Sequence, residues 1–174
     1  MEPVKGGSLS FLPDDIAASL KAERPDNSIS SWALRWVASK PNVKVVLSGM
    51  STMEQVEDNL HTFDKFEPLT EKETNLIAKT ADNIKKRTKN GCTGCAYCMP
   101  CPFGVDIPKN FHIWNELSMY GNKEKAKQAF FQDLSTAARA DQCQKCGKCE
   151  TVCPQGISIR ENLAEAANDF NKLK

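Results

Sequence analysis

The sequence has few of the residues from which many enzyme sites are built, and it carries no strong charge of either sign. Its 174 residues include only two histidines and two tyrosines, and the net charge is +1. A nearly neutral chain gives no electrostatic reason to bind nucleic acid or an acidic lipid surface. The longest apolar run, Val43–Leu47, is interrupted by Lys44 and is far shorter than the roughly 20 residues that cross a bilayer. We therefore expect no membrane span.

The two histidines also do not belong to a recognisable catalytic motif. His61 and His112 have no recognisable nucleophile or base beside them. Aromatic residues make up 7% of the chain and helix-forming residues are frequent, which favours a mainly α protein. Residues Met1–Gly7 contain no apolar leader core. We therefore expect a cytoplasmic protein whose thiols stay reduced.

The cysteines, in contrast, are numerous and closely grouped, because all eight lie in two short runs that each end in a Cys-Pro pair. The first run is Cys92, Cys95, Cys98 and Cys101, and the second is Cys143, Cys146, Cys149 and Cys153. The second run has the spacing C-x2-C-x2-C-x3-C-P that is typical of bacterial ferredoxins. The first run has two residues, rather than three, between its last two cysteines.

This spacing predicts iron–sulfur clusters, because each iron of a cubane needs one soft thiolate. In two-cluster ferredoxins the fourth cysteine of each run binds the other cluster. We therefore predict two [4Fe-4S] clusters with exchanged ligands. The first cluster takes Cys92, Cys95, Cys98 and Cys153, and the second takes Cys143, Cys146, Cys149 and Cys101. Backbone N–H groups, Lys145 and Lys148 would offset the negative charge of such clusters.

Three other uses of the cysteines compete with this prediction. Disulfides are possible for an even number of cysteines, but a reducing compartment disfavours them. Structural zinc usually binds two C-x2-C pairs that are separated by a spacer, rather than four cysteines within ten positions. Eight free structural thiols would be a reactive liability. The iron–sulfur interpretation fits the spacing best.

Apolar periodicity and capping residues predict a series of helices. The expected ranges are 13–22, 28–39, 52–60, 111–120 and 123 to about 137, together with a last helix after Cys153. Thr70 and Glu73 form a capping box that opens a further helix. Residues 43–47 are β-branched and predict a strand.

Several segments of the first half resemble the end of an aldo/keto reductase barrel, namely Met1–Gly7, Ser31–Val37 and Val46–Leu60. Residues 92–101 and 146–150 are similar to the ferredoxin-type extension that some bacterial and archaeal members of that family carry. The two cysteine sets joined by helices also resemble the α-helical ferredoxin domain. The resemblance implies that residues 1–68 are the last β/α units of a (β/α)8 barrel and contain two strands. It also implies that residues 69–90 form a connecting helix and that residues 91–174 form the two-cluster domain.

Members of that family bind NADP(H) at the C-terminal ends of the barrel strands. The resemblance assigns nucleotide contacts to Ser51, Gln55, Asp58 and Asn59, and the alternative is an ordinary capped helix with polar surface residues. The catalytic Asp, Tyr, Lys and His of the family come from earlier strands and have no counterpart in this sequence. We therefore expect NADP(H) binding, and carbonyl reduction, only with a complete barrel.

We expect the chain to be an electron-transfer module of an aldo/keto reductase-like oxidoreductase, which works with a redox partner protein or with the missing portion of the barrel. Two alternatives remain. In the first, the clusters, or zinc, are purely structural in a partner-binding subunit, and in the second the completed barrel is an NADP(H)-dependent reductase. The chain would be a truncated gene product, a fragment or a small subunit. Because one strand pair cannot close a barrel, we expect the face with Trp32, Leu34 and Trp36 to pack on another surface.

Overall fold

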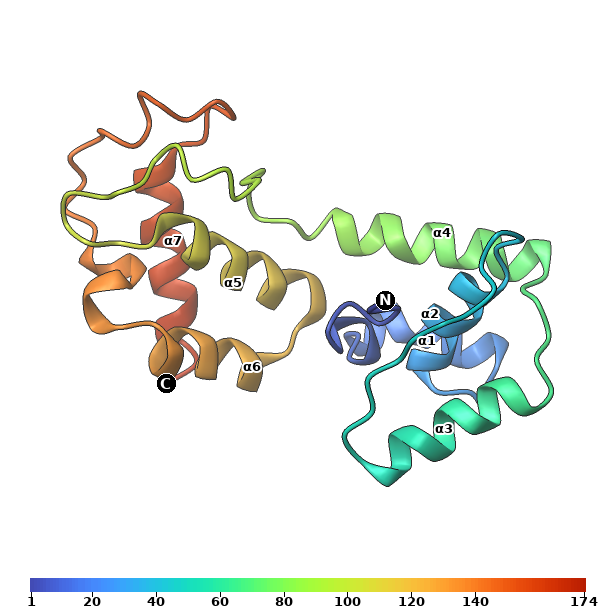
Figure 1. Cartoon of the computed structure of the whole chain (residues 1–174). Coiled ribbons are helices and arrows are strands. Elements are labelled where there is room, and N and C mark those ends of the chain that lie inside the picture. The colour runs from blue at the N-terminus through green and yellow to red at the C-terminus, as the bar shows by residue number, and fades with distance from the viewer. The chain divides into compact units, whose positions relative to one another are not determined.

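The computed structural model describes residues 1–174, which form two compact units, Met1–Lys86 and Arg87–Lys174. Every regular element is helical and there is no strand, as Figure 1 shows, so the mainly α prediction is confirmed. None of the helices is both long and apolar enough to cross a lipid bilayer.

The first unit begins with a short 3-10 turn at Ser8–Ser10 and continues with four α-helices. These are α1 (Asp14–Glu23), α2 (Ile29–Ala38), α3 (Met53–Asp64) and α4 (Glu71–Lys85). Side-chain oxygens of Ser28, Thr52 and Thr70 accept backbone N–H groups at the starts of α2, α3 and α4. Glu73 completes the predicted capping box with Thr70. The helices expected in this half are therefore confirmed, and α4 begins at its predicted cap, Thr70.

The strand predicted at residues 43–47 does not form, and neither do the two strands that the barrel resemblance implies. Val45 and Leu47 stay exposed in an extended segment that has no regular structure. A strand is stable only when its N–H and C=O groups pair with a neighbouring strand. No element of Met1–Lys86 offers such a neighbour, so the β-branched sequence alone is not sufficient.

The first unit has a small core of its own, which includes Trp32 and Leu34. Trp36 is half-exposed at the edge of an apolar groove that also contains Ile77 and Ala81 of α4. The expectation that all three side chains seek a surface outside the unit is thus wrong for Trp32 and Leu34. Their helix packs within its own unit and leaves only Trp36 uncovered.

Three long-range ionic contacts around Glu73 hold the first unit together. The carboxylate of Glu73 is buried and accepts hydrogen bonds from Arg35 on α2, at 3.0 Å from Nη1 and 3.3 Å from Nη2, and from Nε of Arg24 after α1. Burial raises the pKa of Glu73, but hydrogen bonds from Arg35, the Thr70 backbone and Arg24 outweigh it and lower that pKa to about 2. This carboxylate therefore stays ionised and ties α4 to α1 and α2.

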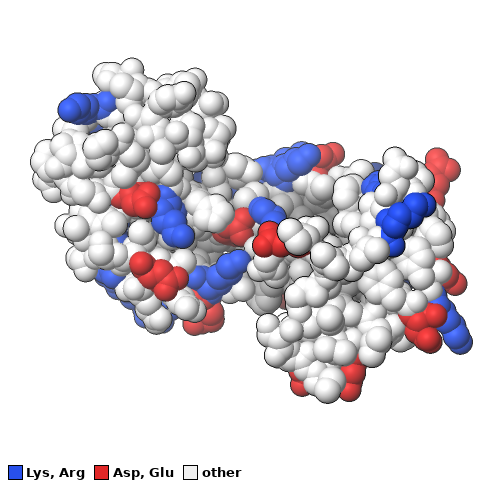
Figure 2. Space-filling view, viewed as in Figure 1, with Lys and Arg blue, Asp and Glu red and all other residues white.

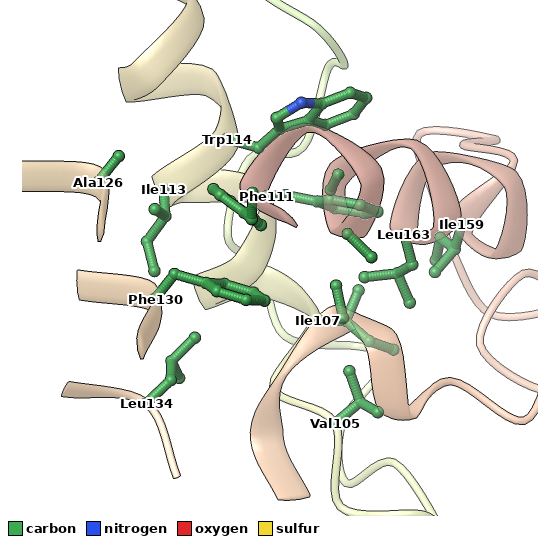
Figure 3. Close-up of a cluster of buried hydrophobic side chains, with 14 residues drawn as sticks. Val105, Ile107, Phe111, Ile113, Trp114, Ala126, Phe130, Leu134, Ile159 and Leu163 are labelled. Carbon is green, nitrogen blue, oxygen red and sulfur yellow. The ribbon is translucent and has the colours of Figure 1, made fainter. Parts of the chain in front are cut away.

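The second unit packs two long helices, α5 (Ile107–Tyr120) and α7 (Ile159–Asn171), with the short α6 (Lys123–Gln128). Figure 3 shows side chains from these helices and from the segments between them meeting in one apolar cluster, with Phe111 and Phe130 inside it. The ring of Phe130 stacks on that of Phe170 with centroids 4.1 Å apart. Cysteines of both loops pack against this core, which therefore holds the two loops in place.

The helix predicted to run from residue 123 to about 137 is shorter than expected. It ends at Gln128 and continues as a single π turn at Ala129–Asp133 and a 3-10 turn at Thr136–Ala138. The guanidinium of Arg139 donates to the carbonyl oxygens of Phe130 (3.0 Å) and Phe131 (2.6 Å). These carbonyls are thereby satisfied without another helical turn.

Candidate metal centre

The two cysteine loops have the same backbone design. In each loop the residues two and four positions after the first cysteine have a positive φ. These are Gly94 (72°) and Ala96 (62°) in the first loop, and Lys145 (54°) and Gly147 (79°) in the second. Such left-handed residues turn successive backbone N–H groups toward one side, which makes a concave surface that favours an anion.

The correspondence between the loops continues beyond the cysteines. After Cys101 and Cys153 the chain turns at Gly104 and Gly156, whose N–H groups donate to those cysteines' carbonyl oxygens at 3.0 Å and 3.1 Å. Each segment then enters a long helix through a buried isoleucine, at the starts of α5 and α7. The shared pattern Cys-Pro-x-Gly-x-x-Ile at residues 101–107 and 153–159 extends the predicted Cys-Pro pairs to the glycine and to the isoleucine that opens each helix.

A first cavity is lined by Cys92, Cys95, Cys98 and Cys153, so it joins three cysteines of the first run to the last cysteine of the second. Its volume is about 20 Å³. The rest of its wall is uncharged and comes mostly from the two segments that enter α5 and α7. Cys95 lies on the exposed side, whereas the other three thiols are half-buried.

A second, larger cavity of about 250 Å³ contains the complementary set, Cys101, Cys143, Cys146 and Cys149. Cys98 also lines this cavity, so the two cavities adjoin. In Figure 1 the two loops lie together at the end of the unit where α5 and α7 begin. Each cavity is thus lined by one of the predicted sets of four cysteines, and Cys98 lines both cavities. The assignment of these sets as cluster ligands stays a prediction.

The third cysteine of each run has a raised pKa. Burial raises the pKa of the Cys98 thiol, and the nearby Cys92, Cys153 and Cys95 raise it further. Burial likewise raises the pKa of Cys149 to about 11, together with Glu150 and two neighbouring cysteines. Four thiolates gathered in one place repel one another, so they need a cationic inorganic group to hold them as thiolates.

No disulfide joins the eight cysteines. No group of three or more His, Cys, Asp or Glu side chains is placed so that it could hold a single metal ion. The residues that line the cavities fit an iron–sulfur group by the chemistry of their donors, because thiols line both cavities, four in the first and five in the second, where Cys98 is the fifth. Backbone concavity and an apolar floor complete that fit.

Two buried asparagines position the loops from α5. The fully buried Asn110 donates to the carbonyl oxygens of Asp106 (2.7 Å) and Ala138 (2.8 Å), and it accepts the N–H of Ala140 at 2.9 Å. Asn115 accepts the N–H of Asn90 at 3.2 Å and donates back to its carbonyl oxygen at 3.1 Å. The sequence analysis missed both residues, because a single polar residue in an apolar helix carries no periodic signal.

Replacing Asn110 with leucine is expected to destabilise the second unit by about 2–4 kcal/mol, because the N–H of Ala140 then loses its buried partner and the carbonyl of Ala138 keeps only the N–H of Asp106. Urea denaturation followed by circular dichroism measures the change. The exposed Asn122 cap of α6, changed to alanine, is the control and should cost about 1 kcal/mol. Equal losses for the two variants would contradict the positioning role of Asn110.

The four residues assigned to a nucleotide lie around α3 but do not form one group. The N–H of Ser51 donates to Oε1 of Gln55 at 2.7 Å, and Nδ2 of Asn59 donates to Oγ of Ser48 at 3.2 Å. Asp58 instead accepts a hydrogen bond of 2.7 Å from Oγ of Ser28, the cap of α2. Three of the residues therefore border the segment before α3, and Asp58 faces α2. Their role toward a nucleotide stays a prediction.

Comparison with protein families gives a match to each unit. The model of the aldo/keto reductase family matches residues 9–82, and the model of a 4Fe-4S dicluster domain matches residues 91–158. Comparison with curated proteins and with solved structures gave no significant match. The second match contains all eight cysteines. The chain therefore combines a region similar to the aldo/keto reductase family at residues 9–82 with a region similar to a 4Fe-4S dicluster domain at residues 91–158.

Proposed function

We propose that the chain is an electron-transfer module that binds two [4Fe-4S] clusters with exchanged fourth ligands. The observation that carries this proposal is the composition of the two cavities. Cys153 lines the cavity of the first run, and Cys101 lines the cavity of the second run. The last cysteine of each run thus meets three cysteines that are distant in sequence, as the exchange requires.

The clusters would supply one-electron chemistry, and the surrounding residues would bind the clusters and set their reduction potentials. The left-handed residues of both loops favour backbone N–H groups that face an anion, and six of the eight cysteines pack against the hydrophobic core. Partial burial and hydrogen bonds to sulfur set the potentials of such groups. Because Cys98 lines both cavities, the two sites are adjacent, and an electron accepted at one site has a short path to the other.

The segment similar to aldo/keto reductases exposes apolar side chains that a partner could cover. Several large apolar side chains of this segment are exposed, among them Val45, Leu47, Met53 and Leu60. Exposed apolar side chains that form one patch favour contact with another polypeptide. We propose that a redox partner, or a chain that supplies the rest of a barrel, covers them. NADP(H) contacts at Ser51, Gln55, Asp58 and Asn59 would then arise only in the completed barrel.

Anaerobic reconstitution with iron and sulfide tests the function. We expect about eight irons and eight sulfides per chain, four of each for every cubane. Reduction should produce an electron paramagnetic resonance signal that disappears on reoxidation and returns on a second reduction. Clusters that assemble in full but cannot be reversibly reduced would favour a purely structural role. A protein that binds only zinc would contradict the electron-transfer function.

A further inference from the structure

The exposed apolar side chains of the second unit are confined to one place. Tyr97, Phe103 and Val152 are its exposed large hydrophobic residues, with exposed fractions of 70%, 48% and 50%. All three line the second cavity, which holds Cys101 and the first three cysteines of the second run. None of them lines the first cavity. The second cavity therefore opens among apolar groups that water does not stabilise.

Positive charge gathers at the same opening. Lys145, Lys148 and Arg160 line the second cavity, whereas the wall of the first cavity contains no charged residue. The guanidinium of Arg160 packs against the loop, with Nη1 at 3.5 Å from the position that a Cβ on Gly147 would occupy. Glu150 pairs with Arg160 at 2.7 Å and offsets its charge, so the two exposed lysines carry the net positive charge.

The space-filling view agrees with this distribution. Over most of the face drawn in Figure 2, acidic and basic side chains are interspersed. The end of the second unit that carries the loops, at the upper left, is nearly free of acidic side chains. An approaching acidic protein would meet little like charge at this end.

We propose that the mouth of the second cavity, defined by Tyr97, Phe103, Val152, Lys145 and Lys148, is the docking surface for an acidic electron-carrier protein. The inference rests on the proposed function and adds to it the partner's chemistry and the site of exchange. Apolar contact with a charged rim is the usual composition of protein interfaces, and opposite charges speed the encounter. Transient redox complexes bury little surface area, so a docking surface of a few side chains is sufficient.

The transfer at this surface involves one electron. The reduced carrier loses the electron, the site beneath the docking surface accepts it, and no bond or proton changes place. The adjoining first cavity then exchanges electrons with the second cavity rather than with the carrier. Its wall offers neither exposed large apolar side chains nor charge for a carrier to recognise.

Stopped-flow reduction of the reconstituted protein by a reduced, acidic [2Fe-2S] ferredoxin tests the docking surface. Changing Lys145 and Lys148 together to glutamate is expected to lower the second-order rate constant at low salt about tenfold or more, because steering is reversed. The rate for the unaltered protein should fall as salt is added, and the variant should lose that dependence. Both lysines are exposed, so the variant is expected to fold.

The matched control changes Lys123 and Lys127 on α6 to glutamate, which alters the net charge equally away from the cavity. This control should keep a rate within about twofold of the unaltered protein, since its charges lie outside the docking surface. Reduction by methyl viologen radical, a small cation, should not slow in the α6 control, and in the loop variant it should slow far less than reduction by ferredoxin does.

A control that slows as much as the loop variant, or a loop variant that reacts with ferredoxin at the normal rate, would overturn the docking surface while viologen reduction stays intact. Failure of both ferredoxin and viologen to reduce the unaltered protein would instead contradict the electron-transfer function itself. The two failures are therefore distinguishable.

Discussion

Changing Cys153 to serine is expected to remove the cluster of the first run and to leave the cluster of its own run in place. Cys153 lines the cavity of Cys92, Cys95 and Cys98, and it does not line the cavity of its sequence neighbours. A hydroxyl is a poor substitute for a soft thiolate, so this site should lose most of its iron. Iron content should fall from about eight to about four per chain.

The identity of the cluster that remains is the decisive readout. Cys153→Ser and Cys92→Ser should leave the same electron paramagnetic resonance spectrum after reduction, although the two residues belong to different runs. Cys101→Ser should match Cys143→Ser in the same way. If Cys153→Ser instead reproduces the spectrum of Cys143→Ser, each run binds its own cluster and the exchange is wrong.

Changing Glu73 to glutamine is expected to destabilise the first unit by about 3–5 kcal/mol, because Arg35 is then left buried without its carboxylate partner. The first unit should unfold at a lower urea concentration, while the circular dichroism of α5 and α7 persists. Glu67, whose side chain is 70% exposed beside Arg24, is the matched control. Its glutamine variant should cost no more than about 1 kcal/mol.

The contribution of Glu73 should also depend on pH in a defined direction. Its folded pKa is about 2, which is below the ordinary value of 4.5, so the folded state favours the ionised form. The stabilisation is therefore complete above pH 4.5 and is lost as the pH falls toward 2. The difference in stability between the unaltered protein and the glutamine variant should shrink over that range. A constant difference would contradict an ionised Glu73.

The helices could be predicted from the sequence because their signals are local. Ser28, Thr52 and Thr70 accept the N–H groups of their own first turns, and Gly121 ends α5 in the left-handed conformation. The strand predicted at residues 43–47 was wrong, because the stability of a strand depends on a partner strand, and no nearby residue supplies one. The early end of α6 depends on Arg139, which lies eleven residues beyond Gln128.

The cysteine spacing similarly predicted the groups that the structure brings together, but not how they are held. Asn110 links the start of α5 to the segment before Cys143 through three backbone contacts. Nothing in the sequence distinguishes this asparagine from a surface residue. The gathering of Tyr97, Phe103 and Val152 at one cavity depends on how the two loops meet, which only the fold decides.

Four thiols from two distant segments hold each of the proposed clusters. The most direct measurement is a diffraction map of the anaerobically reconstituted protein at the iron absorption edge. It should show two separate cubanes, one bonded to Sγ of Cys92, Cys95, Cys98 and Cys153 and the other to Sγ of Cys101, Cys143, Cys146 and Cys149. A map with one metal site, or with Cys101 and Cys98 on the same cubane, would contradict this arrangement.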